Sequence, residues 1–182
     1  MEETGTTGRI EDMTIDEPVT TVRENLGALL PRLRRFARAL TGDVHDADDL
    51  VQVALERALA RAAQWRPEQR LEGWVYGIVR NAWVDELRAR GRGRKVFASD
   101  VDAAEAGASV ADGRETLVAV EAAMQRLPEE QRSAVALVLV EGLSYREAAK
   151  AMDVPIGTLT SRLARGRDAL QALLDPDGGT RS

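Results

Sequence analysis

The sequence predicts an all-α protein made of two small helical domains joined by a flexible linker, the C-terminal one carrying a helix-turn-helix. Apolar residues recur at helical spacing over residues 22–95 and again over residues 115–174. An acidic segment without this periodicity separates the two blocks. We therefore expect a disordered acidic tail (1–21), a first domain (22–95), a linker (96–114), a second domain (115–174) and a C-terminal tail (175–182).

Charge is distributed unevenly along the 182 residues, whose net charge is −5. Residues 1–18 sum to −5 and residues 96–115 to −4, so the rest of the chain sums to +4. A basic remainder is compatible with a nucleic-acid partner. The lack of cysteine excludes disulfides and thiolate metal sites and fits a reducing cytoplasm. Without a long apolar run or an apolar signal segment, we expect no membrane insertion.

Three helices are expected in the first domain. The first runs from about Val22 to a stop at Gly42, the second begins at Asp46 and ends near Trp65, and the third begins near Leu71. Their inward stripes are Leu26, Leu29, Leu30, Leu33, Phe36, Ala37 and Leu40; Leu50, Val51, Ala54, Leu55, Ala58, Leu59 and Ala62; and Leu71, Trp74, Val75, Ile78 and Ala82.

A second face of the third helix carries Tyr76, Arg80, Trp83 and Leu87. Flat rings beside a cation suit unstacked bases. Packing against another helix is the alternative, and it stays open for both Trp83 and Leu87. The basic run from Arg88 to Lys95 follows. Such a run can simply be solvated, but beside aromatic residues it favours contact with phosphate.

The second domain begins with two helices. The first runs from about Glu115 to Arg126, and the second follows Leu127-Pro128 and closes at Gly142. Their expected inward residues are Leu117, Val118, Ala122 and Met124, and then Val135, Leu137, Val138 and Val140.

A helix-turn-helix pattern ends the second domain. Ser144 and Glu147 form a capping box, and Ala149 is small where two helices would cross. Asp153 tolerates a left-handed turn, and Pro155 suits the first position of the next helix. That helix has a core stripe and a polar face suited to a major groove, although a plain hairpin with a solvated basic face is the alternative. The stripe is Ile156, Leu159, Leu163, Leu170 and Leu173, and the polar face is Thr158, Ser161, Arg162 and Arg165.

Catalysis and metal binding are not favoured. The carboxylates of the second helix, Asp48, Asp49 and Glu56, are better explained as acids on a solvated helix surface. His45 is the only histidine, and neither a nucleophile nor a phosphate-loop motif accompanies it. We expect no enzyme activity and no cofactor.

Four segments in order resemble the extracytoplasmic-function sigma factors, which are small bacterial transcription initiation factors. Residues 35–43 resemble the family's first conserved helix, and residues 46–52 resemble its core-polymerase-binding segment. Residues 74–81 resemble its promoter-melting segment, and residues 127–163 resemble its C-terminal DNA-reading region. The resemblance covers nearly all of the chain that is expected to be ordered.

The resemblance implies a cytoplasmic sigma factor that binds core RNA polymerase, directs it to promoter DNA, assists promoter opening and is held by an anti-sigma factor. The implied polymerase contacts are Asp48, Asp49, Leu50, Gln52 and Glu56. The implied contacts to the minus-ten element are Tyr76, Arg80, Asn81, Trp83, Arg88 and Arg90. The implied contacts to the minus-thirty-five element are Thr158, Thr160, Ser161, Arg162, Ala164 and Arg165.

Two rival functions use the same helices. A sigma-like decoy would bind an anti-sigma factor without touching promoters, but the retained basic run and Arg165 argue against it. A homodimeric helix-turn-helix repressor would need a symmetric dimer surface, and none is evident in the sequence.

Overall fold

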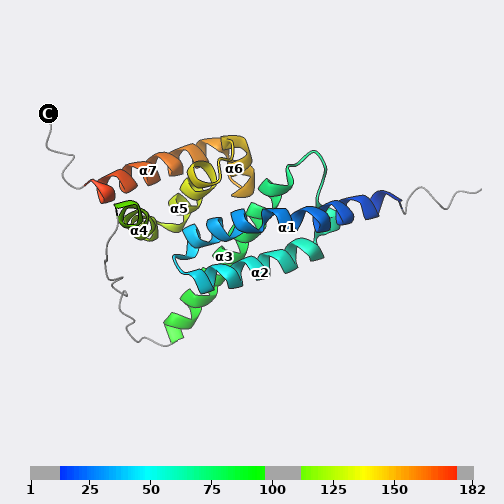
Figure 1. Cartoon of the computed structure of the whole chain (residues 1–182), viewed down its shortest axis with the longest axis horizontal. Helices are drawn as coiled ribbons and strands as arrows, with labels where there is room; N and C mark the ends of the chain where they lie inside the picture. The colour runs from blue at the N-terminus through cyan, green and yellow to red at the C-terminus, as the bar shows by residue number, and fades with distance from the viewer. Residues whose placement is uncertain (1–12, 97–111, 176–182) are drawn as a thin grey trace, which may run out of the picture.

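The computed structural model describes residues 13–96 and 112–175, and both ranges are helical without a strand, as predicted (Figure 1). The N-terminal half contains α1 (Met13–Thr41), α2 (Val44–Ala60), the short turn η1 (Ala62–Gln64) and α3 (Leu71–Val96). The C-terminal half contains α4 (Asp112–Gln125), α5 (Glu129–Val135), η2 (Ala136–Val140), α6 (Tyr145–Ala151) and α7 (Ile156–Leu174). The linker expected at 96–114 falls mostly outside the described residues.

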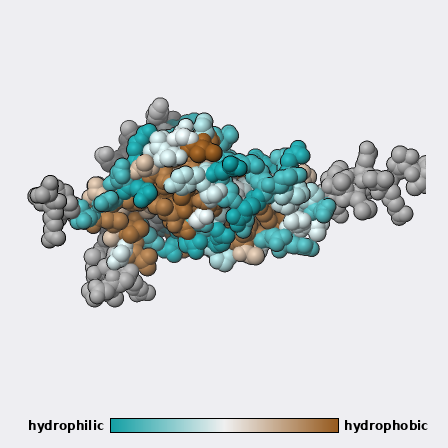
Figure 2. Space-filling view, turned by 90° about the horizontal axis from the view of Figure 1, so that it is seen from above, coloured by the Kyte–Doolittle hydropathy of each residue, from teal (hydrophilic) through white to brown (hydrophobic). Residues whose placement is uncertain are grey.

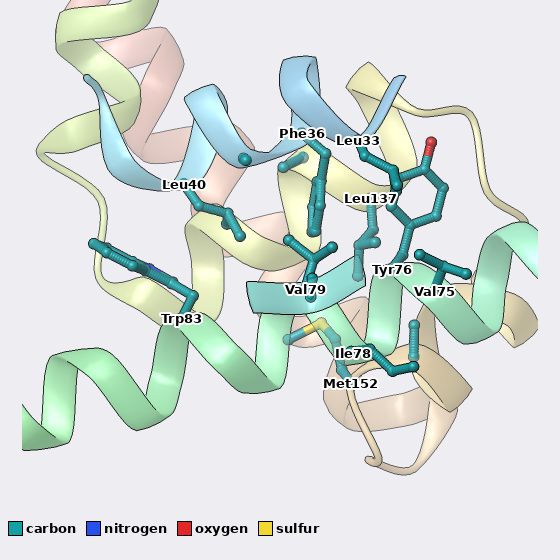
Figure 3. Close-up of a cluster of buried hydrophobic side chains, with 14 of the residues drawn as sticks. Leu33, Phe36, Leu40, Val75, Tyr76, Ile78, Val79, Trp83, Leu137 and Met152 are labelled. Carbon is teal, nitrogen blue, oxygen red and sulfur yellow. The ribbon is translucent and has the colours of Figure 1, made fainter. Parts of the chain in front are cut away.

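The buried side chains of the two halves form one continuous cluster (Figure 3). Helix α1 supplies Leu33, Phe36 and Leu40, α3 supplies residues on several sides, and Leu137 and Met152 enter from the C-terminal half. The rings of Phe36 and Tyr76 meet edge to face, with centroids 5.1 Å apart. Helix α3 is therefore covered by α1 and α2 in its own half and by α6 from the other half.

Four predicted helix starts are wrong by up to nine residues; one of them is the start of α4, which lies at Asp112 instead of Glu115. Helix α1 begins at Met13 instead of Val22, so the expected tail 1–21 is too long; residues 1–12 lie outside the described part. Val19 and Val22 continue the apolar stripe of α1 against the core, which explains the extension. Helix α2 begins at Val44, because the Asp43 carboxylate accepts the N–H groups of His45 and Asp46. Pro155 is the cap of α7 and not its first residue.

The predicted stops and the turn are confirmed. Gly42 and Gly142 have φ values of 76° and 71°, and Asp153, in the turn between α6 and α7, has a φ of 53°. The helix before Gly142 ends in a π turn, where the Glu141 N–H donates to the Ala136 carbonyl across 3.0 Å. Glu141 follows that turn directly.

Some expected core residues are exposed instead. Leu117, at 63 % exposure, is the clearest case, and the others are Leu59, Val118, Ala122, Val140 and Ile156. Within the described ranges no helix covers these side chains. Figure 2 shows apolar surface gathered near the end of the molecule where α4 and the end of α7 lie.

We expect substitution by alanine to have opposite effects on stability at two glycines of α7. A Cβ on Gly166 would lie 2.8 Å from Cγ2 of Val135 and 3.3 Å from the carbonyl of Gln131, whereas a Cβ on Gly157 meets nothing within 4 Å. We expect Gly166→Ala to destabilise the chain by about 1–3 kcal/mol, because α7 must move away from α5. Gly157→Ala should be neutral or stabilising by up to about 1 kcal/mol. Urea denaturation measures both, and equal midpoints would contradict this packing.

Candidate nucleic-acid interface

Helix α7 is held by its buried side, which leaves the predicted recognition face outward. Leu159 and Leu163 are buried against the rest of the C-terminal half, and Gly166 lets α7 approach α5 closely. Opposite this side, α7 presents exposed Thr160, Ala164 and Arg165, with half-buried Thr158, Ser161 and Arg162 beside them. The turn at Asp153 and the preceding helix α6 give the helix-turn-helix arrangement that the sequence predicts.

The two arginines of this face differ in what they contact. The Arg162 guanidinium lies 2.8 Å from the Glu130 carboxylate at the start of α5, and its side chain is only 17 % exposed. Arg165 is exposed and has no ion pair within the described ranges. The hydroxyl of Thr160 donates to the Ile156 carbonyl, and that of Ser161 to the Thr158 carbonyl. Arg165 is therefore the guanidinium of this face that is available to a ligand.

Helix α6 is positioned by the capping box predicted from the sequence. The Glu147 N–H donates to Oγ of Ser144, and the Ser144 N–H donates to the Glu147 carboxylate at 2.9 Å. The hydrogen bonds from Ser144 lower the pKa of the Glu147 carboxyl, which also pairs with Arg70 of the N-terminal half. Ala148 and Ala149 are buried in α6.

The aromatic and basic side of α3 is not an open surface in this arrangement. Tyr76 is fully buried and Trp83 is nearly so, which makes the packing alternative correct for Trp83 here. Leu87 is half-buried. The Arg80 side chain is 14 % exposed, with Nε 3.4 Å from the Glu129 carboxylate. The predicted base-stacking rings are thus buried in this structure and closed to bases.

The remaining predicted contacts of α3 lie further along the helix. Asn81 and Arg88 are exposed. Arg90 pairs with Asp46 of α2 at 3.0 Å and with Glu86, and its guanidinium lies over the Trp83 ring, 5.8 Å from the centroid. Arg90 therefore has partners in the free chain that DNA would have to replace.

The acidic residues of α2 form an exposed row beside a hollow. Asp48, Asp49, Gln52 and Glu56 are exposed, as predicted, whereas Leu50 is buried and supports the helix from inside. The Gln52 amide donates to Glu56, and Asp48 pairs with Arg34 at 3.0 Å. The hollow of roughly 380 Å³ lies between α2 and α3; its lining includes Asp49, Val53, Arg57, Asp85 and Glu86. An acidic, partly apolar groove of this kind suits a basic helical partner.

Sequence reasoning missed Glu141, whose side chain is fully buried against the N-terminal half. Its carboxylate accepts from Nε and Nη2 of Arg35 at 2.9 and 3.0 Å, from Nε of Arg32 at 3.3 Å, and from the hydroxyl of Tyr76. Its backbone carbonyl accepts from Nη2 of Arg32 at 3.0 Å. An acid at the C-terminal end of an apolar helix, where the dipole disfavours it, was the available signal.

The groups around Glu141 have pKa values shifted in the direction that keeps them as hydrogen-bond donors to its carboxylate. Hydrogen bonding to Glu141 raises the pKa of the Arg35 guanidinium above its ordinary value. Burial, followed by the hydrogen bond to Glu141, raises the pKa of the Tyr76 phenol, which therefore keeps its proton and donates it. We call Glu141, Arg32, Arg35 and Tyr76 the Glu141 cluster.

Within the described ranges no group of three or more histidine or acidic side chains could hold a metal ion. No helix there combines the length and apolar character that crossing a membrane requires.

Comparison with known proteins gives consistent matches. Residues 26–93 match the family model for sigma-70 region 2, and residues 117–170 match the one for sigma-70 region 4. The chain is 37 % identical over 166 residues to the ECF RNA polymerase sigma factor EcfG of Rhodopseudomonas palustris, covering 88 % of this chain and 90 % of that protein. It is 38 % identical over 144 residues to SigM of Mycobacterium tuberculosis, covering 79 % and 71 %.

Two solved structures share the fold. The sigma factor RpoE of Bartonella quintana, in complex with the anti-sigma factor NepR, has a TM-score of 0.71 and 33 % identity, covering 86 % of this chain and 98 % of that one. CnrH, in complex with the cytosolic domain of CnrY, has a TM-score of 0.65 and 23 % identity, covering 91 % and 97 %.

Ser144→Ala should remove the cap of α6 and cost about 1 kcal/mol at neutral pH. The pKa of the Glu147 carboxyl is lowered in the folded chain. Its contribution to stability is therefore present at pH values above the ordinary pKa of glutamate, and it is lost as the pH falls through the pKa of the folded chain. The difference in the free energy of unfolding between wild type and Ser144→Ala should therefore become smaller below about pH 4. Denaturation at pH 7 and at low pH measures it, with Thr160→Ala as a control expected within about 0.5 kcal/mol. A stability difference between wild type and Ser144→Ala that does not change with pH would contradict the proposed contribution of the Glu147 carboxylate to the cap.

Proposed function

This chain belongs to the extracytoplasmic-function family of RNA polymerase sigma factors, and we propose that it binds core RNA polymerase, directs it to particular promoters and assists their opening. The observation that carries the proposal is the outward face of α7, where Arg165 is exposed on a helix fixed by a capped helix-turn-helix. Family members act in transcription and not as enzymes, and we propose no catalytic step for this chain.

We assign the proposed polymerase and minus-ten contacts to different helices of the N-terminal half, and the minus-thirty-five contacts to the C-terminal half. We infer that the acidic row of α2 docks on the polymerase, because exposed carboxylates beside an apolar hollow complement a basic helical surface. Helix α3 would contact the minus-ten element with Arg80, Asn81 and the basic residues beyond them. Capture of unstacked bases would offset part of the cost of separating the strands.

Regulation by an anti-sigma factor and a cytoplasmic location belong to the same proposal. The solved relative from Bartonella quintana was captured with an anti-sigma factor, and this chain covers 98 % of that relative. We infer an anti-sigma partner here by that likeness. The decoy alternative remains as an outcome of the transcription test below.

Run-off transcription with core polymerase tests the function directly. We expect promoter-specific transcripts with the wild-type chain. We expect Asp49→Ala combined with Gln52→Ala to weaken polymerase binding roughly tenfold or more, since both side chains are exposed on the proposed docking face. The matched control is Glu24→Ala, which removes an exposed acid from α1. Transcription at the wild-type level by the double variant would exclude this face of α2 as the polymerase-docking surface. If neither the wild-type chain nor any variant supports transcription, the result would favour the decoy.

The proposed base contact and phosphate contact on α7 can be separated by sequence and salt. Arg165→Ala should cost about 1–3 kcal/mol at the correct promoter and flatten preference at one base pair, as expected for a bidentate contact to guanine. Arg162 pairs with Glu130 in the free chain, and we propose that a DNA phosphate replaces this carboxylate on binding, so Arg162→Ala should weaken binding to every sequence similarly and reduce the salt dependence. Fluorescence anisotropy of the full chain with duplexes varied one base pair at a time, at two salt concentrations, distinguishes them. Equal loss on every duplex for Arg165→Ala would make Arg165 a backbone contact.

A further inference from the structure

A hollow of roughly 210 Å³ lies where helix α6 packs beside the start of α3, and it shares no lining residue with the polymerase and DNA contacts proposed above. We propose that it binds a dicarboxylic amino acid, which is a small ligand with one ammonium group and two carboxylates. We call it the α3–α6 hollow, and its lining includes Glu68, Arg70, Gly73, Arg146, Glu147 and Lys150.

The hollow exists because two glycines lie one turn apart on the same face of α3. At Gly77 the two helices touch, since a Cβ there would lie 3.2 Å from the Ala151 carbonyl. At Gly73 a Cβ would meet nothing within 4 Å. Helices α3 and α6 therefore approach closely at one point and leave beside it a space comparable to roughly seven water molecules of the liquid. A space of this size suits a small organic molecule.

The backbone on both sides of the hollow is fixed by hydrogen bonds. In the loop before α3, the indole N–H of Trp65 donates to the Gln69 carbonyl across 3.1 Å, and the Gln69 N–H donates to the Arg66 carbonyl at 2.9 Å. On the other side, the capping box of Ser144 and Glu147 fixes the start of α6. Little backbone ordering is therefore needed when a ligand binds, which favours affinity.

Two of the charged lining residues already neutralise each other. Nη1 of Arg70 lies 3.1 Å from the Glu147 carboxylate, and Nε of Arg70 lies 3.3 Å from the carboxylate of Glu72. The Glu147 carboxylate also accepts from the Ser144 N–H. Arg70 and Glu147 thus have protein partners without a ligand.

The other three charges at the hollow determine the class of ligand. Glu68 on the loop and both Arg146 and Lys150 on α6 are exposed, and none has an ion pair in the part of the chain that the structure describes. Arg146 and Lys150 lie one helical turn apart on the same side of α6. One negative and two positive charges therefore border the hollow from opposite elements.

A ligand with one ammonium group and two carboxylates matches this set of charges. A simple anion would be repelled by Glu68, and a simple cation would be repelled by Arg146 and Lys150. The apolar methylene groups of such a ligand would lie over Gly73 and Ala151, which add no polar side-chain atom to the lining. Exposed ion pairs each contribute little, so we expect a Kd on the order of 1 mM.

The test is a titration of the full chain with L-glutamate, followed by amide NMR shifts, with the ionic strength held constant by KCl. We expect saturable shifts within residues 68–73 and 146–151. Glutarate, which lacks the ammonium group, and L-glutamine, which lacks the side-chain carboxylate, should each bind roughly threefold to fivefold more weakly. D-glutamate is the control for effects of salt, which are the same for both enantiomers. It cannot make all three charge contacts at once, so it should also bind roughly threefold to fivefold more weakly.

Charge variants assign the ligand's groups to their partners. Glu68→Gln should abolish the preference for L-glutamate over glutarate, because the partner of the ammonium group is lost. Arg146→Gln combined with Lys150→Gln should weaken L-glutamate binding by at least roughly tenfold. The matched controls are Glu24→Gln on α1 and Arg167→Gln on α7, which remove exposed charges outside the hollow and should leave the Kd unchanged.

A third variant fills the hollow and leaves every charge in place. Gly73→Leu should reduce L-glutamate affinity by at least roughly tenfold, because its side chain takes the space of the ligand. The matched control is Gly27→Leu, at an exposed glycine of α1 where a Cβ also meets nothing within 4 Å. Circular dichroism checks that both variants keep their helices. If Gly73→Leu does not fold, the charge variants still decide the question.

Two results would overturn the proposal. The first is equal affinity for L-glutamate and D-glutamate, which would show an effect of salt and not of a site. The second is wild-type affinity of a folded Gly73→Leu chain. Neither result depends on transcription or on DNA binding, so the sigma-factor function stands or fails by its own tests.

Discussion

The carboxylate of Glu141 is the charge around which the two halves of the chain are arranged. Its desolvation cost falls almost wholly on the carboxylate, because the guanidinium groups of Arg32 and Arg35 keep part of their hydration. Such a carboxylate is stable inside only when its oxygens are fully hydrogen-bonded, and small shifts of α1 against α3 would break that set. The cluster therefore constrains the relative positions of α1, α3 and the end of η2 more than it stabilises the fold.

Helix α3 shows how one surface can satisfy two demands. Its buried aromatic residues complete the apolar core, and the same residue types are those that bind unstacked bases. In this structure the partners of Arg80 and Tyr76 are carboxylates and a carbonyl of the protein, whose oxygens accept as those of a phosphate would. Nucleic acid that bound these groups, as predicted, would have to replace these protein partners.

The sequence predicted the helices well because their signals are local. The stop at Gly42, the turn at Asp153 and the capping box at Ser144 each depend on a few neighbouring residues. The start of α1 was missed because Val19 gains its stabilisation from distant core residues. For the same reason the burial of Tyr76 and Glu141 could not be foreseen: both depend on contacts more than sixty positions apart. The predicted polymerase and DNA contacts stay predictions.

The π turn of η2 has a further consequence for the direction in which Glu141 points toward the N-terminal half. A helix advances about 100° per residue, so the wider turn changes the rotational phase of the residue that directly follows it relative to an uninterrupted α-helix. Glu141 and the helix-turn-helix both follow this turn in the chain. One local widening therefore sets which way the buried carboxylate of Glu141 points. Substitutions at residues 136–140 that restored a regular α-helix would turn the Glu141 carboxylate away from the arginines of α1 and the Tyr76 hydroxyl.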